Sequence, residues 1–183
     1  MKPPRSLKAR ALQYLAQREQ SRLELRRKLL PHAQAEEAAA LAGTSAYEGE
    51  ASALPERAGA LARVEAVLDW LTAHDYLSQE RFVESRVHAR APRFGNLRIR
   101  QELKQHAVAL PTGAAQALKD SEFDRAREVH ARKFPLPPSG AAEQARQMRF
   151  LMGRGFSPEV IRRVLRDATS AAVAPPEPGA FGD

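Results

Sequence analysis

Apolar side chains recur along most of this chain at the spacing of a buried helix face. Leu7, Ala11 and Leu15 lie four residues apart, and the segment from Val64 to Leu71 fills positions i, i+3, i+4 and i+7. No segment shows the sustained alternation of apolar and polar residues that marks a half-buried strand. The apolar residues are mostly Leu, Ala and Val, and aromatic residues make up only 6% of the chain. Together these features predict an all-α fold.

Short polar and glycine signals predict where several helices begin and end. Ser21 and Ser121 each precede a carboxylate by three residues, as in an N-terminal capping box. Ser157 is followed by a proline, which suits the first position of a helix. Gly155 follows a helix predicted to end near Arg154, where a left-handed residue is needed. These signals divide the chain into about nine helices, mostly of two to four turns.

Two stretches of the chain look like copies of each other. Residues 103–120 align with residues 151–167, so that Ala107 stands opposite Gly155. The N-terminal part fits the same scheme with helices predicted over residues 7–17, 22–30 and 63–74. We therefore predict three tandem three-helix units in an elongated, arched arrangement, because units this small need to share cores with their neighbours.

Composition and the repeat together predict the unit boundaries, which are residues 1–77, 78–120 and 121–169. Residues 33–62 interrupt the first unit with a stretch rich in Ala, Glu and Gly, which we interpret as a mobile insertion. This stretch could instead extend a helix, since Ala and Glu are good helix formers, but several Gly and Pro residues interrupt any long one. Residues 170–183 contain a proline-rich run and are predicted to be a disordered C-terminal tail.

Positive charge is concentrated at the start of the chain. The whole chain has a net charge of +7, and residues 1–32 alone hold nine basic and two acidic residues, an excess of the same size. Such an excess suggests a polyanion or an acidic protein surface as partner.

Basic residues recur on predicted helices of all three units, which favours a shared binding face. For any single one of them, a solvated helix surface is the simpler interpretation. The candidate contacts with a protein partner or DNA are Arg18, Arg22, Arg26, Arg27, Lys28, Arg93, Arg98, Arg100, Lys104, Arg146, Arg149, Arg154, Arg162 and Arg163. Trp70 and Phe94 are candidates for stacking on bases. Trp70 lies next to an apolar stripe and is expected to be partly buried, so Phe94 is the better candidate.

The residues that usually carry catalysis or bind metals are missing or scattered. The chain has no cysteine, which excludes disulfides, thiolate nucleophiles and cysteine-ligated metals. Its five histidines lie one per helical segment, without the i, i+4 pairing of a metal site. Phosphate-binding glycine loops and nucleophile elbows are also absent. We therefore expect no metal, no cofactor and no enzymatic activity.

Several segments, in their order and spacing, resemble the RecX family. They are Ala11–Ala16 (ALQYLA), Ser21–Leu29 (SRLELRRKL), Asp75–Phe82 (DYLSQERF), Arg93–Gly95 with Arg98–Leu103 (RFG and RIRQEL), and Arg149–Leu151 with Arg154–Ser157 (RFL and RGFS). The resemblance spans Leu7 to Leu165 outside the insertion. The chain departs from the family at Ser78 and Gln79, where aspartate is usual, and at Ala107, where glycine is usual.

The resemblance implies three tandem three-helix units and a regulator that binds the RecA recombinase and RecA–DNA filaments. It implies that the protein limits filament growth and lowers ATPase, strand-exchange and coprotease activities, thereby modulating DNA repair, homologous recombination and the SOS response. It implies no cofactor. The family's contacts are spread over a surface, so the candidate residues above come from local charge alone.

Two other interpretations stay open. One is a stand-alone helix-turn-helix DNA-binding protein whose arginine-rich helices enter a major groove. The other is a helical scaffold with no nucleic-acid role. For the regulator we expect a monomer that contacts single- or double-stranded DNA weakly and without sequence specificity. No stretch approaches the roughly 20 apolar residues of a membrane span, and no apolar signal segment follows the basic N-terminus, so we expect a soluble, cytoplasmic protein.

Overall fold

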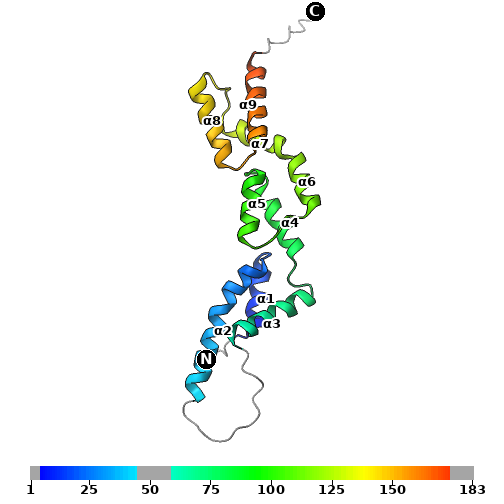
Figure 1. Cartoon of the computed structure of the whole chain (residues 1–183), viewed down its shortest axis with the longest axis vertical. Coiled ribbons are helices and arrows are strands. Elements are labelled where there is room, and N and C mark those ends of the chain that lie inside the picture. Colours follow the sequence, from blue (N-terminus) through cyan, green and yellow to red (C-terminus); the bar gives the residue numbers. More distant parts are fainter. Residues whose placement is uncertain (1–4, 45–58, 174–183) are drawn as a thin grey trace, which may run out of the picture. The chain divides into compact units, whose positions relative to one another are not determined.

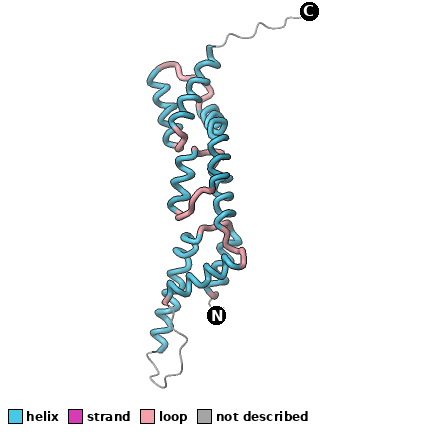
Figure 2. Tube along the Cα trace, turned by 45° about the vertical axis from the view of Figure 1, so that its right-hand side comes forward, coloured by secondary structure: helices cyan, strands magenta, loops and turns pink. Residues whose placement is uncertain are grey.

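The computed structural model describes residues 5–44 and 59–173 of the chain (Figure 1). Within these two ranges the chain forms nine α-helices and no strand (Figure 2). The helices are α1 (Leu7–Gln17), α2 (Arg22–Thr44), α3 (Ala60–Ala73), α4 (Gln79–Arg90), α5 (Asn96–Gln105), α6 (Thr112–Asp120), α7 (Glu122–Lys133), α8 (Ala141–Gly153) and α9 (Pro158–Val173). The prediction of an all-α fold is confirmed.

The chain divides into two compact bodies. The N-terminal body comprises residues 1–85 and 106–108, and the C-terminal body comprises residues 86–105 and 109–183. Helix α4 contributes residues to both. The division into three units, with the boundaries and the elongated arrangement given above, stays a prediction.

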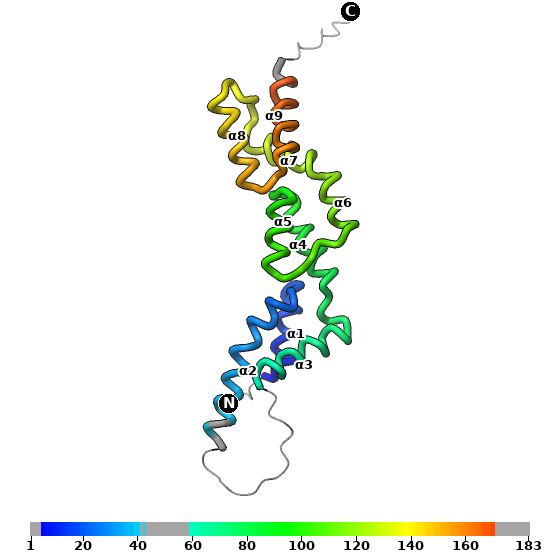
Figure 3. The backbone as a smooth tube through the Cα atoms, viewed as in Figure 1, coloured from blue at the N-terminus to red at the C-terminus, as the bar shows by residue number. Residues whose placement is uncertain are grey.

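The core of the N-terminal body lies between α1, α2 and α3, which pack side by side (Figure 3). Leu25, Leu29 and Ala33 follow each other at intervals of four along α2 and are fully buried. They share this core with apolar residues of α3, among them Val64 and Leu68. The i, i+4 spacing of the sequence thus becomes a single buried stripe on each helix.

The predicted end of the second helix near residue 30 is wrong, because α2 continues to Thr44 through Pro31. Ala33 is fully buried in the core, and a Glu37 carboxylate oxygen accepts a hydrogen bond of 3.1 Å from the backbone nitrogen of Ala60. This packing and the high helix propensity of Ala and Glu outweigh the proline. Residues 33–44 therefore belong to a helix, and residues 60–62, at the other end of the predicted insertion, belong to α3. Residues 45–58, between them, lie outside the described residues.

The C-terminal end of the last helix also differs from the prediction. Helix α9 runs to Val173, so the first residues of the predicted tail are helical. Residues 174–183, the rest of that tail, lie outside the described residues.

The C-terminal body has its own core, where α7 and α8 both pack on α9. Its buried apolar residues are Ala126, Val129, Leu151, Phe156, Ile161, Val164 and Leu165. Buried positions at intervals of three and four along α9 bring one face of that helix against both neighbours.

Three turns of the chain use a left-handed residue. Asp75, Ala107 and Gly155 have φ values of 59°, 56° and 79°. Each follows a buried leucine by four residues, and these leucines are Leu71, Leu103 and Leu151. Ala107 and Gly155 stand opposite each other in the sequence alignment and adopt the same backbone region. The predicted helix stop at Gly155 is confirmed, with the hydrogen bond of 3.3 Å from Phe156 N to Leu151 O that closes such a turn.

The serines of the two predicted capping boxes behave differently. Ser21 Oγ accepts a hydrogen bond of 3.1 Å from Glu24 N, so this cap is confirmed. The cap predicted at Ser121 is wrong, because its hydroxyl donates to Ala117 O at 2.8 Å. Ser121 is the only residue between α6 and α7 and has helical backbone angles, so its side chain faces back to α6.

Candidate functional site

The arginines of α2 pair with carboxylates of α3 within the N-terminal body. Arg22 Nη2 lies 2.5 Å from Glu65 Oε2 and 2.7 Å from Asp69 Oδ1. Arg26 Nε donates to the other oxygen of Glu65. Each pair of residues is spaced by four and therefore projects from one face of its helix. The hydrogen bond from Arg26 is the largest cause that holds the pKa of Glu65 below its ordinary value.

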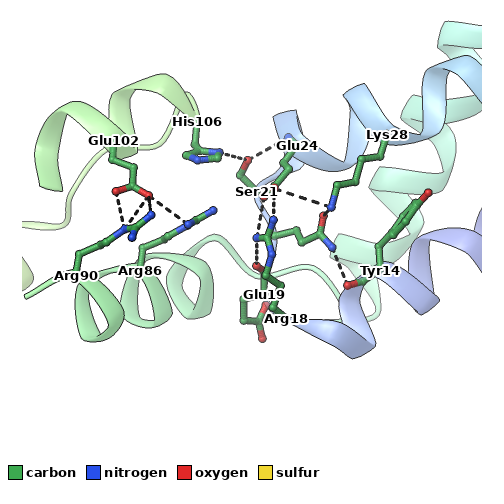
Figure 4. Close-up of polar contacts among 11 residues, drawn as sticks. Tyr14, Arg18, Glu19, Ser21, Glu24, Lys28, Arg86, Arg90, Glu102 and His106 are labelled. Carbon is green, nitrogen blue, oxygen red and sulfur yellow. Dashed lines mark hydrogen bonds and ion pairs between the residues drawn. The ribbon is translucent and has the colours of Figure 1, made fainter. Parts of the chain in front are cut away.

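Two more candidate cations of this body have partners near the start of α2 (Figure 4). Arg18 pairs with Glu24, with Nη1 3.1 Å from Glu24 Oε2. Lys28 Nζ lies 2.7 Å from Gln20 Oε1 and 4.0 Å from a Glu24 oxygen. Arg27 is exposed and has no ion-pair or hydrogen-bond partner for its side chain among the described residues. All but one of the N-terminal candidates are therefore engaged within the protein.

In the C-terminal body the best-placed carboxylates face other groups than the candidate cations. Figure 4 shows Arg86 and Arg90 converging on Glu102, at 3.2 Å and 2.9 Å. Glu122 is only 4% exposed and faces the interior of the body. Neither arginine at Glu102 is among the candidate contacts, so this carboxylate pairs with residues outside the candidate set.

Glu122 bonds to the N-terminal ends of two helices. Its Oε1 accepts hydrogen bonds from Asn96 N at 2.9 Å and from Ser157 N at 3.3 Å. Its Oε2 accepts from the Ser157 hydroxyl at 3.1 Å. Asn96 begins α5 and Ser157 immediately precedes α9. A carboxylate is favourable there because helix N-termini have unpaired N–H groups and positive dipole ends.

Arg125 fixes the loop that leads into α5. It donates to Ala91 O at 3.1 Å, to Phe94 O at 2.8 Å and to Asn96 Oδ1 at 2.7 Å. Burial lowers the pKa of Arg125, and the nearby Glu122 opposes that shift. Because a guanidinium group has five N–H donors in a rigid plane, one side chain holds several loop atoms at once.

The same loop lies in backbone contact with the turn between α8 and α9. Gly95 N donates to Arg154 O at 2.9 Å, and Leu97 N donates to Gly155 O at 3.0 Å. A Cβ atom on Gly95 would lie 2.2 Å from Gly155 O, so only glycine fits there. This approach holds Phe94 and Arg154 beside each other, although they are far apart in sequence.

A pocket of about 450 Å³ opens beside this contact. Four apolar residues and four cations line it: Pro92, Phe94, Val129 and Phe150, and Arg93, Arg132, Lys133 and Arg154. No acidic residue is among the lining residues. Aromatic rings and cations are thus combined at one place on the C-terminal body, which we call the Phe94 pocket.

The guanidinium groups around the Phe94 pocket lie over its aromatic rings. The Arg154 guanidinium carbon is 4.7 Å from the centre of the Phe150 ring and 5.9 Å from that of Phe94. Arg98 is 4.8 Å from the Phe94 ring centre. Arg154 Nη1 also donates to Arg93 O at 3.1 Å. A ring face holds a guanidinium by attraction without neutralising its charge.

The other candidates of the C-terminal body lie outside this pocket. Arg100, Lys104 and Arg149 are exposed and have no side-chain partner among the described residues. Arg146 lies 5.9 Å from the Phe134 ring, Arg163 lies 3.9 Å from the Phe123 ring, and Arg162 donates to a carbonyl of its own helix. Of the candidates in the described part of the C-terminal body, the structure therefore brings Arg93, Arg98 and Arg154 together beside the Phe94 pocket.

Several residues of this site were not selected from the sequence. Arg132 and Lys133 end α7 and look like an ordinary basic helix terminus. Glu122 stands one residue after the serine that was taken as a cap, so its buried role was hidden. Gly95 after Arg93 and Phe94 was the one sequence signal that a close backbone approach occurs here.

The two aromatic candidates for base stacking both have cations beside their rings. Trp70 packs partly buried against the N-terminal core, as predicted, with Lys8 Nζ 3.0 Å from its ring centre and His74 stacked at 4.2 Å. Phe94 is also partly buried and has Arg98 and Arg154 beside it. Neither aromatic ring is therefore an unoccupied surface for stacking a base.

In the part of the chain that the structure describes, no three His, Cys, Asp or Glu side chains gather as metal ligands would. None of the helices formed by the described residues is both long and apolar enough to cross a membrane.

The chain is similar over most of its length to regulatory proteins. It is 48% identical over 167 residues to "Regulatory protein RecX" of Leptothrix cholodnii, a match that covers 90% of each chain. It is 45% identical over 168 residues to the protein of the same name from Ralstonia nicotianae, covering 90% of this chain and 89% of that one. Residues 120–165 match the family model described as "RecX, third three-helix domain".

A solved structure has the same fold. The crystal structure of RecX from Lactobacillus salivarius matches with a TM-score of 0.60 at 16% identity, covering 90% of this chain and 95% of that one. At this level of identity the likeness supports the fold alone, and it agrees with an all-α architecture of helical repeats.

Proposed function

The chain belongs to the RecX family of regulatory proteins and is thus a regulator and not an enzyme, and we propose that it binds the RecA recombinase and RecA–DNA filaments and inhibits them. In this proposal the bound protein limits filament growth and lowers the ATPase and strand-exchange activities of the recombinase. It thereby modulates DNA repair and recombination in the cytoplasm. The observation that carries the proposal is the similarity to curated family members over nine-tenths of the chain.

The charge distribution supports a filament as the partner. A filament on DNA presents phosphates and protein surface together, and the chain has a net charge of +7. Exposed cations with no side-chain partner in the described ranges of the chain are spread over helices of the C-terminal body, and they include Arg100, Lys104 and Arg149. Contacts spread in this way suit an extended partner better than a single small ligand.

The proposal is tested with the ATPase activity of the recombinase on single-stranded DNA. We expect the rate to fall when the protein is added in substoichiometric amounts, because one bound regulator affects the growth of many filament subunits. An ATPase rate that is unchanged at micromolar protein would contradict the proposal.

A titration of labelled DNA across salt concentrations separates this function from a stand-alone DNA-binding module. For the regulator we expect weak, salt-sensitive binding without sequence preference. Tight, sequence-selective binding at physiological salt would instead support the helix-turn-helix interpretation. Sedimentation of the protein alone tests the expectation that it is a monomer.

A further inference from the structure

We propose that the Phe94 pocket binds an acidic peptide segment of a protein partner, one that carries an apolar side chain between carboxylates. The pocket combines an apolar floor, made by Pro92, Phe94, Val129 and Phe150, with a rim of four cations. If the function proposed above is right, this protein partner is the recombinase, and only that identification rests on the proposed function. The chemistry of the pocket does not depend on it.

The cations of the rim are available to a ligand. Arg93 and Lys133 are exposed and have no side-chain partner among the described residues. Arg132 pairs with Glu128 at 3.3 Å, but both side chains are more than 60% exposed. A pair so exposed is screened by water and contributes little, so it yields readily to a better-placed carboxylate.

The arginine nearest the floor is held in position before any ligand arrives. Arg154 lies over the Phe150 ring and donates to the carbonyl of Arg93. Its flat face is taken by the ring, which leaves N–H groups at the edge of the guanidinium for hydrogen bonds. Two parallel N–H groups match the two oxygens of a carboxylate, and a prepositioned group loses little entropy on binding.

The apolar floor distinguishes an acidic peptide from a nucleic acid. Contacts to a DNA backbone use cations and leave an apolar floor unfilled. Stacking a base would need a free aromatic face, yet Arg98 and Arg154 lie beside the Phe94 ring and Arg154 lies over the Phe150 ring. A side chain such as phenylalanine or leucine fills the floor while flanking carboxylates meet the rim, so the whole pocket is used.

The pocket is also built to keep its shape. Glu122 anchors the loop below it through a buried hydrogen bond and Arg125 through a partly buried one, and Gly95 fixes the loop against the neighbouring turn. Binding therefore needs no rearrangement of the backbone, which favours measurable affinity for a short peptide.

The test measures binding of the intact protein to a fluorescein-labelled peptide that has one phenylalanine between runs of glutamate. Fluorescence anisotropy gives the dissociation constant. Two comparison peptides replace the phenylalanine by alanine or every glutamate by glutamine. We expect each change to weaken binding by about tenfold or more. Equal affinity for the three peptides, or no binding of the parent peptide, would overturn the proposal.

The matched variants are Arg93→Gln with Lys133→Gln, and Arg166→Gln with Lys119→Gln. Each double variant removes one arginine and one lysine that are exposed and unpartnered among the described residues of the same body. Because none of the four side chains holds the fold, both variants should stay folded. We expect the pocket variant to bind the parent peptide about tenfold more weakly and the control to bind it as the wild type does. Equal losses in both variants would show a nonspecific charge effect and overturn the proposal.

Labelled oligothymidylate and the ATPase assay separate this site from the function proposed above. If the pocket variant loses oligothymidylate binding but keeps peptide binding, the site is a nucleic-acid site and the proposal fails. If the wild type inhibits the recombinase but does not bind the peptide, the pocket assignment fails while the proposed function stands. If the wild type binds the peptide but leaves the ATPase rate unchanged, the proposed function fails while the pocket assignment stands.

Discussion

The two bodies of this protein are both rich in arginine, but they use these arginines differently. In the N-terminal body, Arg22 and Arg26 pair with Glu65 of a neighbouring helix. In the C-terminal body, Arg98 and Arg154 lie over aromatic rings, and no carboxylate of the residues that the structure describes pairs with them. A count of charges along the sequence therefore measures the excess of a segment but not the availability of its cations to a partner.

The difference arises from where the acidic residues stand. Glu65 and Asp69 lie on the polar face of α3, four residues apart, and meet the arginines of α2 with the same spacing. In the C-terminal body Glu122 is buried beneath two helix ends. We infer that the candidate cations of the first body chiefly hold helices together and that those around the Phe94 pocket of the second are available for recognition.

The largest expected effect is on the backbone contact that supports the Phe94 pocket. Gly95→Ala places a Cβ atom 2.2 Å from Gly155 O, and the atoms that it meets are backbone atoms and not the flexible end of a side chain. We expect a loss of about 3 kcal/mol in unfolding free energy. Urea unfolding followed by circular dichroism measures it.

Gly113→Ala is the control for this variant. It adds a methyl group in α6 with no atom within 4 Å of it, and alanine favours a helix. Stability should rise by up to about 1 kcal/mol. Similar unfolding midpoints for the two variants would show that the close approach of Gly95 is not a constraint.

The second largest effect is expected at the buried carboxylate. Glu122→Gln keeps the size of the side chain but directs an NH₂ group at donors, so hydrogen bonds to Asn96 N or to Ser157 are lost. We expect a loss of about 2 kcal/mol in unfolding free energy. Glu128→Gln removes an exposed carboxylate of the same helix and should change it by less than about 0.5 kcal/mol. Equal losses in unfolding free energy for the two variants would show that Glu122 contributes no more than an exposed carboxylate.

Local signals in the sequence predicted much of the fold. The apolar periodicity gave the first helix its observed bounds, Leu7–Gln17, and Ser21 and Gly155 ended or started helices as predicted. These features depend on interactions within a few residues, which a single sequence displays. The cap at Ser121 failed because the next helix follows so closely that the serine itself is helical.

Interactions between helices could not be predicted from the sequence. The length of α2 depends on Ala33 packing against α3, and the pairing of Arg22 depends on which face α3 presents. The Phe94 pocket joins residues from three separate segments. Arg93, Arg98 and Arg154 could be selected by charge, but nothing local predicted that they would meet.

A smaller effect on stability is expected when paired cations of the N-terminal body, and not unpaired ones of the C-terminal body, are removed. Arg22→Gln with Arg26→Gln breaks the ion pairs with Glu65, and we expect a loss of about 1 kcal/mol in unfolding free energy. The expected loss is small because both arginine side chains are 40% exposed and screened by solvent. Arg100→Gln with Lys104→Gln should change stability by less than about 0.5 kcal/mol, since these side chains have no partner among the described residues. If the second variant were the less stable, the proposed contrast between the bodies would be wrong.

The smallest effect is the pH dependence of the same ion pairs. Hydrogen bonds from Arg26 and then Arg22 lower the pKa of Glu65 in the folded protein. A lowered carboxylate pKa contributes stability above the ordinary value of about 4.3, and this contribution is lost as the pH falls through the folded value. The wild type should therefore be more stable than Glu65→Gln at neutral pH by at most about 1 kcal/mol, and the difference should shrink on acidification below about pH 4. Paired urea titrations at neutral and acidic pH measure it, and a difference that grows on acidification would show that Glu65 is not stabilised as a carboxylate.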